Sequence, residues 1–168
     1  EEIALLAGVS KGTLFLYFNS KEDLFKAVIR ANLSDHFPIW NKEFAGFQGS
    51  TEDMVNYAMQ SWWQRIGNTN ASGITKLVTS EARNFPDVVQ FYEDEVMRPG
   101  QALFKKILQR GIDNGEFRPI DTDKAVYSLV AVILFLSMWK HSLSACVDSF
   151  SLSPEAFLQT HVEALMHG

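Results

Sequence analysis

The sequence predicts an all-α protein. Long segments repeat apolar residues three and four positions apart, which is the period of a helix with one buried face. Short polar breaks with glycine, asparagine or proline separate these segments, and no segment is convincing as a strand. The 46% of hydrophobic residues in a chain of 168 is ample for a helical core.

The first thirty residues predict a short helix, a tight turn and two further helices. Ile3, Ala4 and Ala7 share one face of the first helix. Gly8 can adopt the positive φ that ends a helix, and Ser10 can cap the helix that follows. This order of elements is a helix-turn-helix, the corner that places a helix in the major groove of DNA.

The second of these helices has an inner and an outer side. Leu14 and Phe18 are four residues apart and should face the core, and Ser20 with Asp23 should form a capping box for the third helix. The remaining side chains point outward or sideways: Lys11, Gly12, Thr13, Phe15 and Tyr17. Corners of this kind also occur in helical proteins that do not bind DNA, so spacing alone leaves that alternative open.

The string IALLAGVSKGTLFLYFNSKEDLFKAV, residues 3–28, closely resembles the DNA-binding segment of tetracycline-repressor-like (TetR family) transcriptional regulators. The resemblance implies that Thr13 and Tyr17 contact phosphate or a base edge, that Lys11 meets DNA near the helix start, and that Lys21 contacts phosphate. The full set of candidate DNA-binding residues is Ser10, Lys11, Gly12, Thr13, Phe15, Tyr17 and Lys21.

Two features qualify this match. Phe15 stands where the family often has tyrosine, so that position offers apolar contact, for example to a thymine methyl, in place of a hydrogen bond. The chain also opens inside the motif, and the helix that should precede it is absent from the sequence, so we expect weak DNA binding by this chain alone.

The net charge of −5 lies in the body of the protein. Residues 1–30 hold four basic and four acidic side chains, so this segment is neutral and the remainder carries the whole excess. A neutral head predicts DNA binding through a few placed phosphate contacts, without a broad basic surface.

The rest of the chain predicts a helical body. We divide the chain into a helix-turn-helix DNA-binding domain at residues 1–36, N-terminally incomplete and sharing its last helix, and a ligand-binding and dimerisation domain at residues 37–168. The third helix should end before Pro38, and a loop with Gly46 and Gly49 should follow. The further expected helices are 51–66, 72–84, 86–114 with a kink or split at 98–100, 121–146 and 153–166.

The segment 125–139 is apolar nearly all round. A membrane span is the alternative, but fifteen residues at about 1.5 Å each fall short of a hydrocarbon core of about 30 Å, so we expect no membrane. A helix buried on one side in its own core and on the other against a partner subunit fits better, and a family-like homodimer would build a four-helix interface with the last helix. Candidate interface residues are Val126, Leu129, Ile133, Phe157, Val162 and Leu165.

The body also predicts a pocket. The string KLVTSEARNFPDVVQFYEDEV, residues 76–96, loosely resembles ligand-binding domains of the same family. Aromatic residues fall in helices that would surround a central cavity in that fold, although plain core packing explains each one singly. Candidate ligand-binding residues are Gln60, Trp62, Trp63, Glu81, Phe104, Phe135, Ser137 and Trp139.

Catalytic chemistry is not indicated. The histidines show no metal-ligand spacing, no nucleophile elbow or phosphate loop occurs, and we expect neither an enzyme nor a metal or cofactor. The single Cys146 fits a reducing compartment, and the acidic N-terminus has no secretory signal, so we expect a cytoplasmic protein.

Together these observations predict a dimeric, ligand-responsive DNA-binding transcriptional regulator. A repressor fits best: it would bind a palindromic double-stranded operator and be released by a small apolar or aromatic effector. The alternative left open is a helical ligand carrier or interaction protein that retains the corner without binding DNA.

Overall fold

The computed structural model describes residues 2–144 and 152–167, and this part of the chain is helical without a strand. Its α-helices are α1 (Glu2–Leu6), α2 (Lys11–Tyr17), α3 (Lys21–Ile29), α4 (His36–Ala45), α5 (Thr51–Trp62), α6 (Gly73–Ser80), α7 (Pro86–Tyr92), α8 (Arg98–Asp113), α9 (Thr122–Met138) and α10 (Pro154–His167). Short π-helical turns continue several of them: η1 (Arg30–Ser34), η2 (Trp63–Gly67), η4 (Glu93–Met97) and η5 (Trp139–Leu143). The 3₁₀ turn η3 (Asn70–Ser72) leads into α6.

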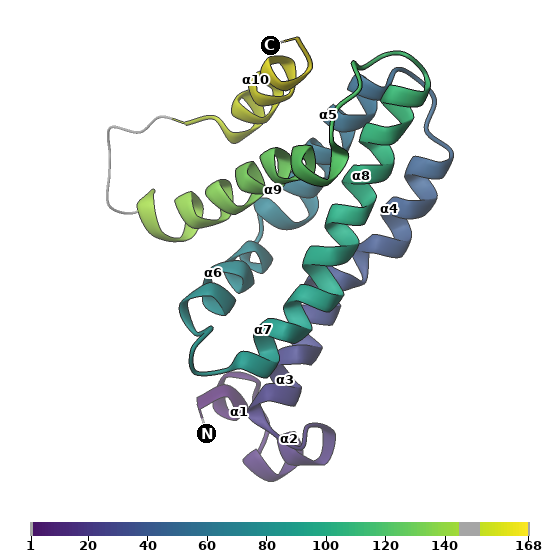
Figure 1. Ribbon diagram of the computed structural model, residues 1–168. Coiled ribbons are helices and arrows are strands. Elements are labelled where there is room, and N and C mark those ends of the chain that lie inside the picture. Colours follow the sequence, from purple (N-terminus) through teal and green to yellow (C-terminus); the bar gives the residue numbers. More distant parts are fainter. Residues whose placement is uncertain (1, 145–151, 168) are drawn as a thin grey trace.

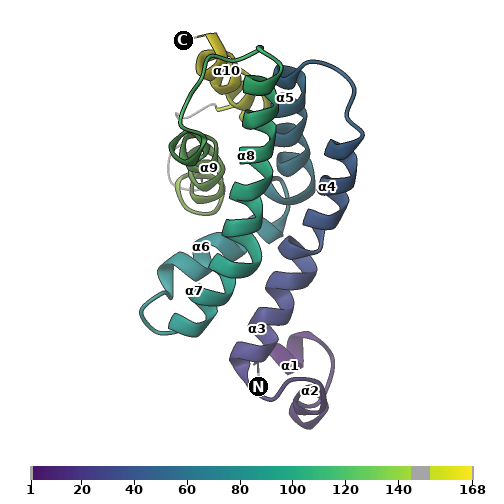
Figure 2. The same cartoon turned by 45° about the vertical axis from the view of Figure 1, so that its right-hand side comes forward.

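The helices form an elongated bundle with a small head at one end. Helices α1 and α2 lie at this end beside the start of α3, and α10 lies at the opposite end (Figure 1). The helical run α3–η1–α4 lies alongside α7–η4–α8, and α3 packs directly on α7 (Figure 2). Helix α9 packs on α6 and α8, and α10 packs on α5, so the core sits between these layers.

A single hydrophobic core extends along this bundle. It begins at Ile29 and Leu33 near the head and reaches Leu158 and Val162 in α10, all of them buried. Every helix from α3 to α10 contributes at least one residue to it. The head is thinner: of the described residues of α1 and α2, Ala4 alone is buried.

The helix predicted for residues 21–36 runs further than expected. After Asp35 the chain continues as α4 to Ala45, so the loop predicted after Pro38 was wrong for residues 37–45. Pro38 falls in the first turn of α4, where backbone N–H groups have no intrahelical partner and proline costs little. The π turn η1 ends one helix and lets the next begin with little change in direction.

Two other boundaries differ from the prediction. Helix α6 ends at Ser80, four residues early, because Glu81 is its C-cap and accepts the Asn84 side-chain amide at 2.8 Å. The chain is not split at Arg98-Pro99-Gly100: α7, η4 and α8 follow one another without a loop. The π turn η4 immediately before Pro99 accommodates the missing backbone donor.

The predicted helix 121–146 is confirmed as far as the structure describes it. Asp121 accepts from the backbone N–H groups of Asp123 and Lys124, and helical turns continue to Leu143. Cys146 lies outside the described residues. The segment Thr122–Leu143 is long and apolar enough to cross a membrane by length and composition, although core helices of soluble proteins pass the same test. It packs here against α6 and α8 and buries residues such as Leu129 and Leu136 completely.

Candidate functional site

The turn between α1 and α2 has the geometry that its residues predict. Gly8 has a φ of +67°, in the left-handed region that suits glycine. The Ser10 hydroxyl accepts the backbone N–H of Thr13 at 3.0 Å and lies 2.8 Å from the Thr13 hydroxyl. Ser10 therefore caps α2, and Thr13 is held at the same end of the helix.

Helix α2 presents its side chains to solvent. None of its residues is buried, and Lys11 and Gly12 near its start are exposed. Phe15 and Tyr17 expose 54% and 78% of their surface. A helix with so much exposed aromatic surface is available for an interaction outside the described chain.

Lys21 lies at the junction of the head with the body. It is the first residue of α3, and the helix start is capped by the Ser20 hydroxyl, which accepts the Asp23 N–H at 3.0 Å. The Lys21 ammonium is exposed and lies 5.6 Å from the ring centroid of Phe85, next to α7. The same side chain that the family resemblance assigns to DNA thus also touches the body.

Two more cations continue this contact: Lys26 of α3 and Arg30, the first residue of η1. The Arg30 guanidinium lies 4.7 Å and the Lys26 ammonium 5.6 Å from the ring centroid of Phe91. Arg30 also pairs with Glu95 of η4 at 3.3 Å. We call the six residues of this contact the α3–α7 clamp: Lys21, Lys26, Arg30, Phe85, Phe91 and Glu95.

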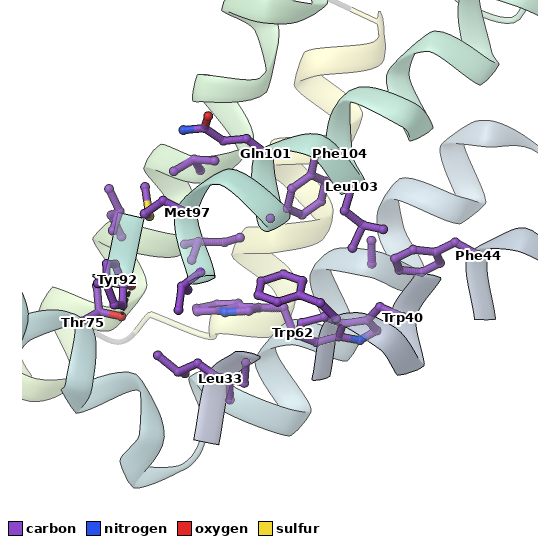
Figure 3. Close-up of a pocket in the computed structure, with 18 residues that line it drawn as sticks. Leu33, Trp40, Phe44, Trp62, Thr75, Tyr92, Met97, Gln101, Leu103 and Phe104 are labelled. Carbon is purple, nitrogen blue, oxygen red and sulfur yellow. Dashed lines mark hydrogen bonds between the residues drawn. The ribbon is translucent and has the colours of Figure 1, made fainter. Parts of the chain in front are cut away.

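An apolar cavity lies inside the body. Residues of α4 to α9 with the turns η1, η2 and η4 line it, and among its described lining residues none is charged. Figure 3 shows Trp62 and Phe104 in its middle, Phe44 at one end, and Thr75 with Tyr92 at the other. The free volume is about 80 Å³. This small space with a mostly apolar lining suits an apolar group.

Polar groups in this cavity are few. The hydroxyls of Thr75 and Tyr92 are 2.9 Å apart, and both residues are buried. Burial raises the pKa of the Tyr92 hydroxyl above its ordinary value, so it is a neutral donor at physiological pH. The indole of Trp40 already donates to Ser61 at 2.9 Å, which leaves the Gln101 amide as the other polar group on the lining.

Two of the predicted ligand-binding residues line this cavity, Trp62 and Phe104. Trp63 and Gln60 instead bind α10: the indole donates to the Glu155 carboxylate at 2.7 Å, and the amide donates to the Glu155 carbonyl at 3.0 Å. They face away from the cavity because they hold the start of the last helix.

The other four candidates are also displaced. Glu81 caps α6, and the Ser137 hydroxyl donates to the Ile133 carbonyl of its own helix at 2.9 Å. Phe135 is partly exposed and packs on Phe157 with ring centroids 5.5 Å apart, and Trp139 begins the turn η5. Six of the eight predicted residues do not line this cavity: Gln60, Trp63, Glu81, Phe135, Ser137 and Trp139.

The sequence reasoning missed the α4 side of the cavity. Leu33, Phe37, Trp40 and Phe44 all line it, and they are spaced four, three and four residues apart. This is the spacing of one helix face. The helix predicted from the sequence ends before Pro38, so the prediction does not include this face. Tyr92 lay in the string that resembled ligand-binding domains and was not singled out.

The predicted dimer-interface residues differ in how far they are buried within the single chain. Val126, Leu129 and Val162 are fully buried in the core of the single chain, so the prediction that they face a partner is corrected. Ile133 lines the cavity, whereas Phe157 and Leu165 are partly buried against the core. The exposed apolar residues of α9 are instead Tyr127, Phe135 and Met138.

Comparison with known proteins bears on both parts of the chain. Residues 1–28 match a family model described as bacterial regulatory proteins, tetR family. The HTH-type transcriptional repressor KstR2 of Mycolicibacterium smegmatis is 28% identical over 139 residues, which are 82% of this chain and 66% of that repressor.

Two solved structures share the fold. The transcriptional regulator FadR from Bacillus subtilis, in complex with stearoyl-CoA, superposes with a TM-score of 0.79 at 18% identity, over 99% of this chain and 86% of that one. A Mesorhizobium loti protein assigned to the TetR family gives a TM-score of 0.70 at 19% identity, over 99% and 81%. The capped helix α2 lies inside the matched segment, so residues 1–28 are identified as a head of the type found in bacterial regulatory proteins of the tetR family.

Proposed function

We propose that this protein is a ligand-responsive transcriptional repressor that binds a palindromic operator as a homodimer in the cytoplasm. The observation that carries the proposal is that α7 contacts both sites: its Tyr92 lines the cavity, and its Phe91 lies against Lys26 and Arg30. A carrier protein would need the cavity, but it would not need an exposed, capped α2.

The exposed side of α2 would form the DNA interface. Its hydroxyls and aromatic rings, with Lys11 and Lys21 at the two helix starts, are suited to a few backbone contacts that set register. In a two-fold dimer, two such helices would enter successive major grooves about 34 Å apart.

The effector would carry a slender apolar group. The related fold of FadR was solved with stearoyl-CoA, an acyl thioester. The cavity of this chain is mostly apolar and small, and its described lining has no charge. These properties favour an elongated hydrocarbon segment over a charged or polycyclic ligand.

The cavity and the head would communicate through α7 and η4. Tyr92, Val96 and Met97 line the cavity, while Phe91 and Glu95 of the same turns hold Arg30. A ligand that moved the lining residues would therefore shift the clamp residues beside them. Repression is relieved if the state with bound effector has the lower affinity for DNA.

The test measures binding of the full-length protein to DNA from upstream of its own gene by fluorescence anisotropy. Lys21→Ala should weaken binding and reduce the slope of log K against log salt by about one unit, because one phosphate contact is lost. Tyr17→Phe should weaken binding without changing this slope, because only a hydroxyl is removed.

The matched control is Lys106→Ala, a loss of the same charge at an exposed site on α8. It should leave both affinity and salt slope unchanged. If Lys21→Ala and Tyr17→Phe both bind as tightly as the native protein, this face is not the DNA interface.

A further inference from the structure

The hydroxyl pair in the cavity leaves one O–H group without an acceptor. Thr75 and Tyr92 each carry one O–H group, and the single hydrogen bond between their oxygens uses one hydrogen. In the described part of the chain, neither hydroxyl has a second partner. One O–H group therefore remains without an acceptor in an apolar surrounding, which is costly unless a bound molecule accepts it.

The surroundings of this pair restrict what could accept that hydrogen. Both residues are at least nine-tenths buried, and most of the other residues that line the cavity are apolar. A carboxylate placed here would lose its hydration and would find no cation among the described lining residues. A neutral carbonyl oxygen accepts the same hydrogen bond at a much smaller desolvation cost.

The pair also lies at one end of the cavity. Figure 3 places Thr75 and Tyr92 at the end opposite Phe44, with Trp62 and Phe104 between them. Apart from the Gln101 amide, the cavity is thus polar at one end and apolar along the rest of its lining. A ligand that fits this distribution has an acceptor near one end of an unbranched hydrocarbon chain.

We propose that Thr75 and Tyr92 form a polar anchor for the carbonyl oxygen of a neutral, elongated apolar effector, such as a ketone, ester or thioester. This inference rests on the proposed effector site and specifies its ligand class. The anchor favours a carbonyl-bearing chain over a plain hydrocarbon because it donates a hydrogen bond to the carbonyl oxygen. It disfavours a free fatty acid because no cation on the described lining would offset the desolvation of the carboxylate. Tyr92 is also next to Phe91 of the α3–α7 clamp, so the anchor engages the helix that holds the head.

The experiment compares three probes of equal chain length: 2-undecanone, undecane and undecanoate. Each is titrated into the full-length protein, and binding is followed by tryptophan emission, because Trp40 and Trp62 line the cavity. The ketone should bind about tenfold tighter than the alkane, the size expected for one hydrogen bond in a dry site. Undecanoate should bind more weakly than the ketone.

The variant that removes the anchor is Thr75→Val with Tyr92→Phe. Replacing both partners by apolar groups of the same shape should leave the fold nearly unaffected, which a circular dichroism melt checks. The ketone should then lose its advantage while undecane binds as before. If the double variant does not fold, Tyr92→Phe alone is compared, and it should reduce the ketone advantage. The control is Thr79→Val, the same chemical change as Thr75→Val at an exposed site of α6, which should alter none of the three affinities.

Several results would overturn the anchor. They are equal binding of ketone and alkane by the native protein, a ketone advantage that survives the double variant, tighter binding of undecanoate than of the ketone, or no binding by any probe. None of these results would contradict the proposed function as a transcriptional regulator, which is tested separately by operator binding. Loss of operator binding with the anchor intact would leave a ligand-binding protein of another class.

Discussion

At Gly111, an added Cβ atom would improve helix propensity but would clash with Phe117. It lies in the last part of α8, where alanine is normally the better helix former by about 1 kcal/mol. A Cβ added there would lie 2.2 Å from Cδ2 and 2.8 Å from Cγ of Phe117. The ring cannot move aside easily, because the Phe117 backbone N–H donates to the Gly111 carbonyl at 3.0 Å.

We therefore expect Gly111→Ala to lower the free energy of unfolding by about 1–2 kcal/mol, since overpacking costs about 1–3 kcal/mol and exceeds the gain in helix propensity. Gly100→Ala is the matched control in the same helix. Its Cβ would meet Phe37 at 3.6 Å, an ordinary contact, so this variant should be more stable by about 0.5–1 kcal/mol. Urea unfolding measures both, and a stabilised Gly111→Ala would contradict the argument.

The sequence predicts those features that depend only on residues close together in the chain. Ser10, Ser20 and Gly8 act as predicted because a cap or a positive φ depends on a few neighbouring residues. Trp63 was misplaced for the opposite reason. Its hydrogen-bond partner Glu155 is 92 residues away in the sequence. No local sequence pattern indicates that the indole N–H donates to so distant a carboxylate.

The α3–α7 clamp adds to the apolar packing of α3 on the body, and its strength contributes to how firmly the head is held. Three cations, Lys21, Lys26 and Arg30, stack on two phenylalanines, Phe91 of α7 and its N-cap residue Phe85, and each contact is worth about 0.5–1 kcal/mol at an exposed site. Phe91 carries two of these contacts. Since the chain near α1 and α2 buries little, α3 depends on this support.

Phe91→Leu should therefore speed amide hydrogen exchange in α3 by about three- to tenfold, because it removes two cation–π contacts while keeping an apolar side chain. Phe47→Leu is the control, since it removes the stacking of Arg110 on an aromatic ring at 5.9 Å elsewhere in the fold. It should leave exchange in α3 unchanged. Equal exchange in α3 for the native protein and Phe91→Leu would mean that the clamp does not hold this helix.

Element by element, apolar periodicity located the helices and failed at their ends. Pro38 was given too much weight, because proline stops a helix only in its interior and not in a first turn. Because the predicted helix ended before Pro38, the predicted cavity did not include the α4 residues Phe37, Trp40 and Phe44. The π turns were not predictable from the residues, and η4 lies between cavity and clamp, where π turns often mark functional sites.

The whole molecule has an apolar surface that its own core does not use. Helix α9 buries Val126, Leu129 and Leu136 inside the chain, but leaves Tyr127 58% exposed and Phe135 and Met138 each 38% exposed. The sequence showed that this helix is apolar all round, but not which side is inward, because that depends on α6 and α8 packing against it. A second copy of the chain is the partner that we propose for the exposed side.

Tyr127→Glu should then convert a dimer into a monomer, because it places an unpaired charge in an apolar contact and should weaken association by at least about a hundredfold. Light scattering behind a sizing column measures the mass directly. Ile39→Glu is the control: Ile39 is 49% exposed on α4, so the same loss of apolar surface occurs on another helix. It should remain dimeric. If Tyr127→Glu keeps the native mass while its melt shows an intact fold, this side of α9 is not the subunit interface, and the spacing of the two recognition helices on DNA must be set by another contact.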